Sequence, residues 1–260
     1  MPAYATERAA RRHAGILLDA RSRLRLAAAL ALMAPLIAAL GQWTDVDLML
    51  ADWLYNRATG NFPWREAWLT ATFGHEIVKA GLTLLAIVFV VLALLDVVRP
   101  QPMLERPLAR LRLRVIACSA VLVPLATSLL KQASSAHCPW DLARYGGSEP
   151  YVRLFEALPA GSLPGHCMPA GHASSALWLV SLAVLWLPGP GRGAWRAACL
   201  ALAPGLVLGW MQQMRGAHFL THTLWSAWIA CAIVLALVVL LQPSGETVRR
   251  APAGTRFRAR

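Results

Sequence analysis

The stretch Met214-Arg-Gly-Ala-His-Phe-Leu-Thr-His222 is a short polar island between two long apolar segments, residues 197–214 and 223–242. Each segment is long enough to cross a bilayer, which takes about 17 to 25 residues. One arginine and two histidines therefore stand at a membrane boundary, where ionisable groups are costly and are usually functional. The competing interpretation is a polar helix cap at the membrane interface.

Four more apolar segments lie upstream, which makes six candidate spans: residues 26–42, 77–98, 115–130, 168–188, 197–214 and 223–242. The composition agrees with this count, because 57% of the residues are hydrophobic and only 15% are charged. Backbone polar groups must be satisfied internally in lipid, which favours helices. We predict an all-α, polytopic membrane protein with six transmembrane helices over residues 26–242, between a basic segment at 1–25 and a basic tail at 243–260.

The formal net charge of +12 would also suit a nucleic-acid-binding protein, but the distribution of the charge argues against that class. Of the 25 basic residues, 18 fall in segments 1–25, 99–114, 192–196 and 249–260. With six spans, all four segments lie on one side of the membrane. Because basic loops stay in the cytoplasm, we expect both termini there. No nucleic-acid partner is expected.

A short amphipathic helix is predicted on the opposite side, after the first span. Its apolar stripe has helical spacing and is opposed by Asp45, Asp47 and Asp52; the stripe consists of Val46, Met49, Leu50, Trp53 and Leu54. Nearby tryptophans suggest that this helix lies at the membrane surface. We expect the three aspartates to have a scaffolding role rather than a catalytic one.

The five cysteines form two groups. Cys118, Cys199 and Cys231 fall within spans, where cysteine is usually a small packing residue. Cys138 and Cys167 fall on the non-cytoplasmic side, where disulfides can persist. The sequence leaves open whether these two form a disulfide or remain free thiols.

Three polar stretches fall on that same side, each at the end of a predicted helix. They begin at Lys131, Pro169 and Arg215 and read Lys131-x6-Cys138-Pro139, Pro169-Ala-Gly-His172 and Arg215-Gly-Ala-His218-x3-His222. Together they would offer cations for an anion and imidazoles for proton transfer or nucleophilic attack. The beginning of the span at 168–188 adds free N–H groups that favour a bound phosphate, and Gly171 lets the ligand approach the backbone.

These stretches resemble the three motifs of the type 2 phosphatidic acid phosphatase family, which also includes vanadium-dependent haloperoxidases. The family motifs are Lys-x6-Arg-Pro, Pro-Ser-Gly-His and Ser-Arg-x5-His-x3-Asp, and the resemblance covers roughly residues 115–235. The order, the spacing and the membrane side agree, and the layout of six spans is similar to that of the integral-membrane members.

The chain departs from the family pattern at four positions. Cys138 takes the place of the motif-one arginine, and Ala170 takes the place of the motif-two serine. In the third motif, alignment on His218 puts Gln212 at the arginine position and His222 at the aspartate position. Alignment on Arg215 would instead make His222 the nucleophile, with Ser226 at the aspartate position. We prefer His218, because that alignment needs no insertion.

By this resemblance, His218 attacks phosphorus and forms a phosphohistidine, His172 protonates the leaving alkoxide, and water hydrolyses the intermediate. His222 would orient His218, although Asp141 or Glu149 in the long loop could supply a carboxylate instead. Lys131, Arg215 and Gly171 would bind the phosphate. The family implies no cofactor and no metal.

The resemblance thus implies a metal-independent phosphatase of membrane lipids, acting on a lipid phosphate monoester or diphosphate at the outer face. We expect it in a bacterial inner membrane, with membrane lipids and the lipid phosphate as partners. One alternative is a catalytically inactive relative that binds or transports lipid phosphates. Another is a metal site built from His172, His218 and His222, since imidazole suits several transition metals.

Overall fold

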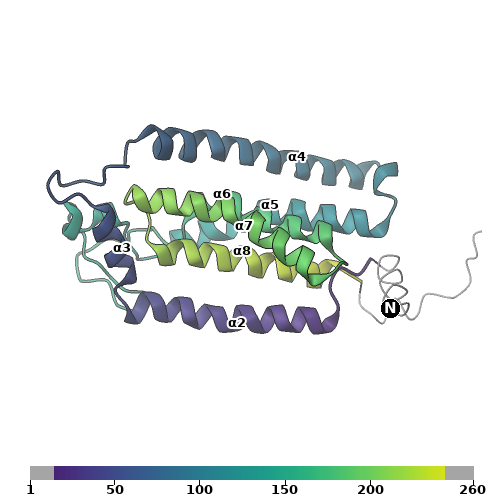
Figure 1. Ribbon diagram of the computed structural model, residues 1–260, viewed down its shortest axis with the longest axis horizontal. Helices are drawn as coiled ribbons and strands as arrows, with labels where there is room; N and C mark the ends of the chain where they lie inside the picture. Colours follow the sequence, from purple (N-terminus) through teal and green to yellow (C-terminus); the bar gives the residue numbers. More distant parts are fainter. Residues whose placement is uncertain (1–14, 244–260) are drawn as a thin grey trace, which may run out of the picture.

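The computed structural model describes residues 15–243, with the side chain of His75 excepted, so residues 1–14 and nearly all of the predicted tail at 243–260 lie outside it. The prediction of an all-α fold is confirmed for the described residues, which form helices and no strand. The long helices lie side by side along the long axis of the molecule, as Figure 1 shows.

The helices follow one another with short connections, except for the long loop before residue 171. In chain order they are α2 (Ala20–Trp43), α3 (Val46–Leu54), the π-helix η1 (Leu69–Ile77), α4 (Val78–Val98), η2 (Pro102–Leu104), α5 (Pro107–Gln132), η3 (Pro139–Asp141), η4 (Ala143–Tyr145), α6 (Gly171–Leu177), the 3-10 helix η5 (Trp178–Trp186), α7 (Gly191–Met214) and α8 (Leu220–Leu241). The first predicted span begins earlier than expected, because Asp19 caps α2 by accepting a hydrogen bond from the Ser22 N–H.

Five of the six predicted spans correspond to helices that are long and apolar enough to cross a membrane: Ala20–Trp43, Leu69–Val98, Pro107–Gln132, Gly191–Met214 and Leu220–Leu241. The remaining one, Gly171–Trp186, is a shorter apolar helix. Its second half is a 3-10 helix, which rises about 2.0 Å per residue instead of about 1.5 Å. The two halves together reach about 29 Å, close to the roughly 30 Å of a hydrocarbon core. The length of Gly171–Trp186 is thus compatible with a sixth membrane crossing. The count of six spans stays a prediction.

The two ends of the described chain meet at one end of the bundle. The backbone N–H groups of Leu17 and Leu18 lie 3.2 and 3.1 Å from the side-chain oxygen of Gln242 and donate to it. The connection between α4 and α5 lies at the same end, where Arg110 pairs with Asp96 at 2.6 Å. In Figure 1, α3 lies at the opposite end.

The core lies where α5, α6 and η5 pack together. Val115, Val123, Ala173 and Leu177 are completely buried, and Trp178 is 1% exposed. In contrast, α2 and α4 are on the outside and expose many large apolar side chains, as helices that face lipid do. The buried α6 therefore holds the second motif rigidly against its neighbours.

The predicted amphipathic helix is present as α3. Its apolar stripe points away from the bundle, since Met49 is 67% and Trp53 is 72% exposed, whereas Asp47 is 4% exposed. Asp47 accepts hydrogen bonds from the N–H and the hydroxyl of Thr221 at the start of α8. Burial raises the pKa of Asp47, and the hydrogen bonds from Thr221 oppose that shift. Asp47 therefore braces α8, in line with a scaffolding role.

Candidate active site

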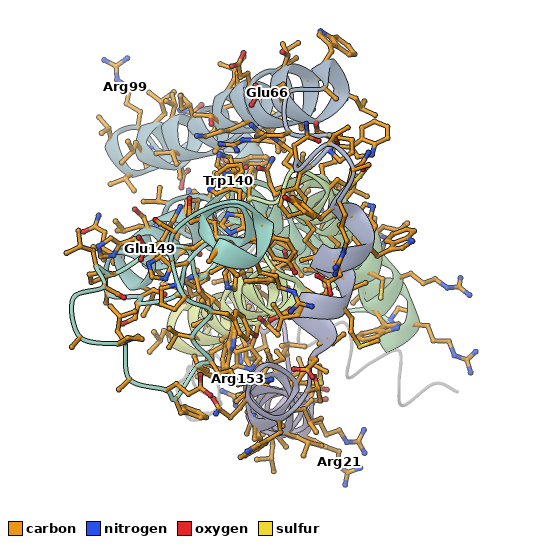
Figure 2. The ribbon with its side chains drawn as sticks, turned by 90° about the vertical axis from the view of Figure 1, so that its left-hand side faces the viewer. Arg21, Glu66, Arg99, Trp140, Glu149 and Arg153 are labelled. Carbon is orange, nitrogen blue, oxygen red and sulfur yellow. A yellow bond between two sulfur atoms is a disulfide. The ribbon has the colours of Figure 1, made fainter. Side chains whose placement is uncertain are left out.

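The three polar stretches meet at the end of the bundle that carries α3. Lys131 lies in the last turn of α5, and His172 lies in the first turn of α6. His218 lies in the turn between α7 and α8, and His222 lies in the first turn of α8. Figure 2 views the molecule from this end, with Trp140 near the middle. The sequence predicted this convergence, and the structure has it.

The turn before His218 depends on Gly216. Its φ of +73° lies in the left-handed region, which favours glycine. A side chain there would also meet Phe62, since an added Cβ would lie 2.4 Å from the ring. The carbonyl of Gly216 accepts a hydrogen bond from the N–H of Trp140 at 2.9 Å. This bond joins the first stretch to the third.

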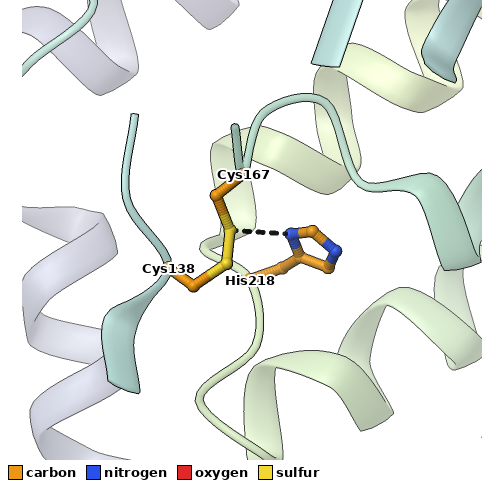
Figure 3. Close-up of side chains that lie close together, drawn as sticks. All are labelled: Cys138, Cys167 and His218. Carbon is orange, nitrogen blue, oxygen red and sulfur yellow. Dashed lines mark hydrogen bonds between the residues drawn. A yellow bond between two sulfur atoms is a disulfide. The ribbon is translucent and has the colours of Figure 1, made fainter. Parts of the chain in front are cut away.

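Cys138 and Cys167 form a disulfide, with 5.3 Å between their Cα atoms, which decides the alternative that the sequence left open. The bridge links the residue before Pro139 to the residue two before Pro169, so it ties the first stretch to the second. Its Cys167 Sγ lies 3.5 Å from Nδ1 of His218, as the dashed line in Figure 3 marks. The disulfide thus forms one wall beside the His218 ring.

A third link joins the second stretch to the third. The N–H of Ala170 donates to the carbonyl of His222 at 3.1 Å. The hydroxyl of Ser226 lies 3.0 Å from the carbonyl oxygens of both Ala170 and His222. Ser226 is therefore engaged with backbone, which disfavours the alignment that gave it the role of the family aspartate.

The three histidines form a row with His218 in the middle. The ring centroids of His172 and His218 are 6.3 Å apart, and those of His218 and His222 are 5.7 Å apart. Nδ1 of His218 lies 3.4 Å from Nδ1 of His222, so one nitrogen can donate to the other. If His218 is the donor, its Nε2 keeps a lone pair for nucleophilic attack.

His218 is held in its neutral form. It is 3% exposed, and this burial lowers its pKa well below the usual 6.5. The positive charges that His222, Lys131 and His172 carry when protonated lower the pKa of His218 further. A neutral imidazole is the form that a nucleophilic or basic role requires.

Two cavities flank this row. One of about 420 Å³ lies between α4, α5 and α6 and is bounded by Lys131, Gly171 and His172. The other, of about 560 Å³, lies between α2, α5, α8 and the long loop and is bounded by His222. Nothing lies within 4 Å of a Cβ added to Gly171, so its backbone is open to a ligand in the first cavity.

Arg215 has other contacts in the structure than those expected from the motif. Its guanidinium donates to the carbonyl of Arg65 at 2.9 Å and to the side-chain oxygen of Gln212 at 3.2 Å. Burial lowers the pKa of Arg215. Gln212, which replaces the family arginine, is 1% exposed, and its amide nitrogen has no hydrogen-bond partner among the described residues. Arg215 is therefore bound to Arg65 and Gln212, and it is not among the residues that line either cavity.

Glu149 of the long loop, one of the two residues that could have supplied a carboxylate to His218, pairs with another histidine. Glu149 lies 3.4 Å from Nε2 of His137, so it is paired with a loop histidine. In the described part of the chain, Nδ1 of His222 lies 3.4 Å from Nδ1 of His218, where it can accept the hydrogen bond that the family carboxylate would accept. The sequence identified His222 by its position in the motif.

Among residues 15–243, one set of side chains has donor atoms close enough together to hold a metal ion. Cys138, Cys167 and His218 offer ligand atoms within 4.8 Å of one another. Metals bind the cysteine thiolate, and these two sulfur atoms are joined in a disulfide. These three side chains therefore lack the thiolates that a metal ion would need from the two cysteines.

Sequence reasoning did not single out the hydroxyl groups along the smaller cavity. Ser128 lies one turn before Lys131, and Ser174 and Ser175 follow His172. The two α6 hydroxyls donate to the carbonyls of Gly171 and His172, at 2.6 and 2.7 Å. Their helical spacing from Lys131 and His172 was the signal that could have identified them.

One comparison with known proteins gives a match. The family model of the PAP2 superfamily matches residues 112–246, which is more than half of the chain and includes all three stretches. No curated protein and no solved structure matches the chain.

Proposed function

Because the chain belongs to the PAP2 superfamily, whose members are generally phosphoric ester hydrolases, we propose that it is a membrane lipid phosphatase. It would release phosphate from a lipid phosphate monoester or diphosphate at the outer face of the membrane. The observation that carries this proposal is the row of three histidines, whose first member, His172, lines a cavity together with Lys131.

The reaction begins with the attack of His218 Nε2 on phosphorus. A phosphorus–nitrogen bond forms, the bond from phosphorus to the lipid oxygen breaks, and His172 gives its proton to the leaving alkoxide. Water then attacks the phosphohistidine, loses a proton to His172 and releases inorganic phosphate. Lys131 and the backbone at Gly171 would contact the equatorial oxygens, and Arg215, which binds Arg65 and Gln212, would contribute its charge from further away.

The position of His218 supports its role as the nucleophile. It lies between His172, the proposed acid, and His222, whose Nδ1 is 3.4 Å away. Nδ1 of His222 can accept a hydrogen bond from the Nδ1–H of His218. This bond would fix the tautomer of His218 whose Nε2 is free to attack. The hydroxyl of Ser226 contacts backbone carbonyls, which leaves His222 without the partner that the other alignment requires.

The shape of the smaller cavity supports a lipid substrate. Its polar end has Lys131 and His172, whereas Ala86, Pro124 and Trp178 line its other end. On their helices, Pro124 and Trp178 lie six or seven residues further into the bundle, a distance of about 10 Å at 1.5 Å per residue. A phosphate at the polar end would therefore leave room for the first carbons of an attached chain within the membrane layer.

The test is phosphate release by the purified protein across a panel of lipid phosphates and diphosphates in detergent micelles. We expect release by the wild type and its loss in His218→Ala and His172→Ala. A matched control is His166→Asn, because His166 is an exposed loop histidine with a φ of +49°, which asparagine tolerates. Wild-type release that survives both active-site substitutions would refute the mechanism.

A second candidate is a relative that binds or transports lipid phosphates without turnover. It is favoured by Cys138 and His222, which replace the family's motif-one arginine and third-motif aspartate. Rapid quenching with a radiolabelled lipid phosphate distinguishes the two, because only the enzyme accumulates acid-labile phosphohistidine at His218. Binding of the lipid with neither phosphohistidine nor free phosphate would favour this second candidate.

A further inference from the structure

The chain has only two lysines, Lys79 and Lys131, among its 25 basic residues. They are 52 residues apart in the sequence, yet both line the smaller cavity, one from α4 and the other from α5. The remaining basic residues are all arginines. Both lysines of the chain therefore line the same cavity as His172.

Lys79 lies in a helix that is otherwise strongly apolar. The stretch Leu69–Val98 has a mean hydropathy of 2.8 in its most apolar part, which begins just after Lys79, and a charged side chain so close to that part is rare. Such residues usually face a cavity or the interior of the bundle. Thr83, one turn further on, lines the same cavity and donates to the carbonyl of Lys79 at 2.8 Å.

An ion pair does not account for Lys79. Among the described side chains, no carboxylate lies within 4.0 Å of it. Lys79 is exposed, and it is one of the residues that line the cavity. Lys79 thus lines the same cavity as His172 and has no carboxylate partner among the described side chains.

The site also has fewer cations than its family motifs provide. Cys138 replaces the motif-one arginine and is joined to Cys167. Arg215 donates to Arg65 and Gln212. A transferring phosphoryl group carries charge on three equatorial oxygens and needs fixed cations around it. Lys131 alone is a weak match for that charge.

We propose that Lys79 is a second phosphate-binding lysine, which acts across the cavity from Lys131 and makes up for the arginine missing at Cys138. The proposal rests on the phosphatase function stated above. It assigns to α4, which lies outside the three motifs, a direct contact with the phosphate of the substrate. Lysine suits this position because its flexible stem can carry the point charge from the surface of α4 to an oxygen.

The experiment compares Lys79→Met, Lys79→Arg and the control Arg57→Met. Arg57 is exposed in the segment that follows α3, and its substitution removes the same charge from the same end of the molecule. We expect Lys79→Met to raise KM for the lipid phosphate, and Ki for inorganic phosphate as a competitive inhibitor, by about 10- to 100-fold. Lys79→Arg should restore part of the loss, and Arg57→Met should change neither constant.

The outcomes separate this inference from the proposed function. Wild-type turnover with unchanged KM and Ki in Lys79→Met would overturn the role of Lys79 and leave the phosphatase intact. An absence of wild-type turnover would instead overturn the proposed function. Direct binding of inorganic phosphate to wild type and Lys79→Met, measured by calorimetry, would then decide the inference: weaker binding to the variant supports it, and equal binding refutes it.

Discussion

His222 is the residue at which this chain differs most from its family in chemical terms. A carboxylate would bring a negative charge to His218, whereas a neutral imidazole brings only a hydrogen-bond acceptor. The 3.4 Å between the two Nδ1 atoms is compatible with such a bond. We therefore expect His222 to orient the His218 ring without stabilising an imidazolium as a carboxylate would.

Substitution of His222 tests this division. We expect His222→Ala to lower kcat by about 100-fold or more, because the His218 tautomer is no longer fixed. His222→Asp, which restores the family residue, should stay within about 10-fold of the wild type. The measurement is kcat at saturating lipid phosphate, with thermal unfolding of each variant as the control for folding. Equal kcat in His222→Ala and wild type would remove His222 from the mechanism.

The buried position of His218 predicts the pH dependence of the reaction. Its pKa is lowered below 6.5, so the proposed nucleophile should stay neutral in acid where an ordinary histidine is protonated. We expect the acidic limb of kcat/KM, measured from pH 4 to 9, to have its midpoint below 6.5. An acidic limb at or above pH 6.5 would contradict the assignment of His218 as the buried nucleophile.

The same shift has an effect on stability with a definite sign. Below pH 6.5 the unfolded chain protonates His218 while the folded chain does not, so protons favour unfolding. The contribution of His218 to stability is therefore fully present above pH 6.5 and declines as the pH falls below that value.

At the scale of elements, the site is held by contacts between segments far apart in the sequence. Asp47 of α3 holds the start of α8 through Thr221. Arg153 of the long loop donates to Asp45 at the start of α3 and to the carbonyl of Thr44, and Figure 2 shows Arg153 beside the end of α2. The loop is thus fastened at several points, with the disulfide closest to His218.

Reduction of the disulfide should therefore loosen the loop. The bridge closes a segment with a sequence separation of 29, for which the chain-entropy argument gives about 3.6 kcal/mol. We expect a reductant, or Cys138→Ser with Cys167→Ser, to lower the thermal midpoint by several degrees and to lower phosphate release. Cys231→Ser is the matched control, since this cysteine is free in α8. An unchanged midpoint after complete reduction would contradict the prediction.

At the scale of the whole molecule, the arrangement has two different ends. One end carries the arginine-rich connections and both ends of the described chain, and the other carries α3, the long loop and the histidine row. Basic connections favour the cytoplasm. We therefore expect the histidine row to face the outside, where a disulfide persists.

Labelling of single cysteines tests this orientation. In a variant whose free cysteines are replaced by serine, Ser148→Cys should react with a membrane-impermeant maleimide on intact cells. Arg192→Cys, exposed in the first turn of α7, should react only after permeabilisation. Equal labelling of both positions on intact cells would overturn the orientation.

Much of the fold and of the candidate site followed from local patterns. Apolar length predicted the helices, as for α8, because lipid leaves the backbone no other partners. The three stretches were found by their spacing from Lys131 to His222. For Lys79, helical spacing favours an ion pair with Glu76 or His75 over a contact with a substrate, and only the tertiary structure places Lys79 beside the cavity of Lys131.

The sequence alone therefore determined the class of fold, the family, and the histidines and lysine of the three motifs, because each depends on hydrophobic length or on spacing within a few helical turns. The tertiary structure decided the disulfide, the face of α3 that is buried, the contacts of Arg215 and the partner of Lys131 across the cavity. These depend on which faces of distant helices meet. Packing sets those contacts, and no local pattern in the sequence records them.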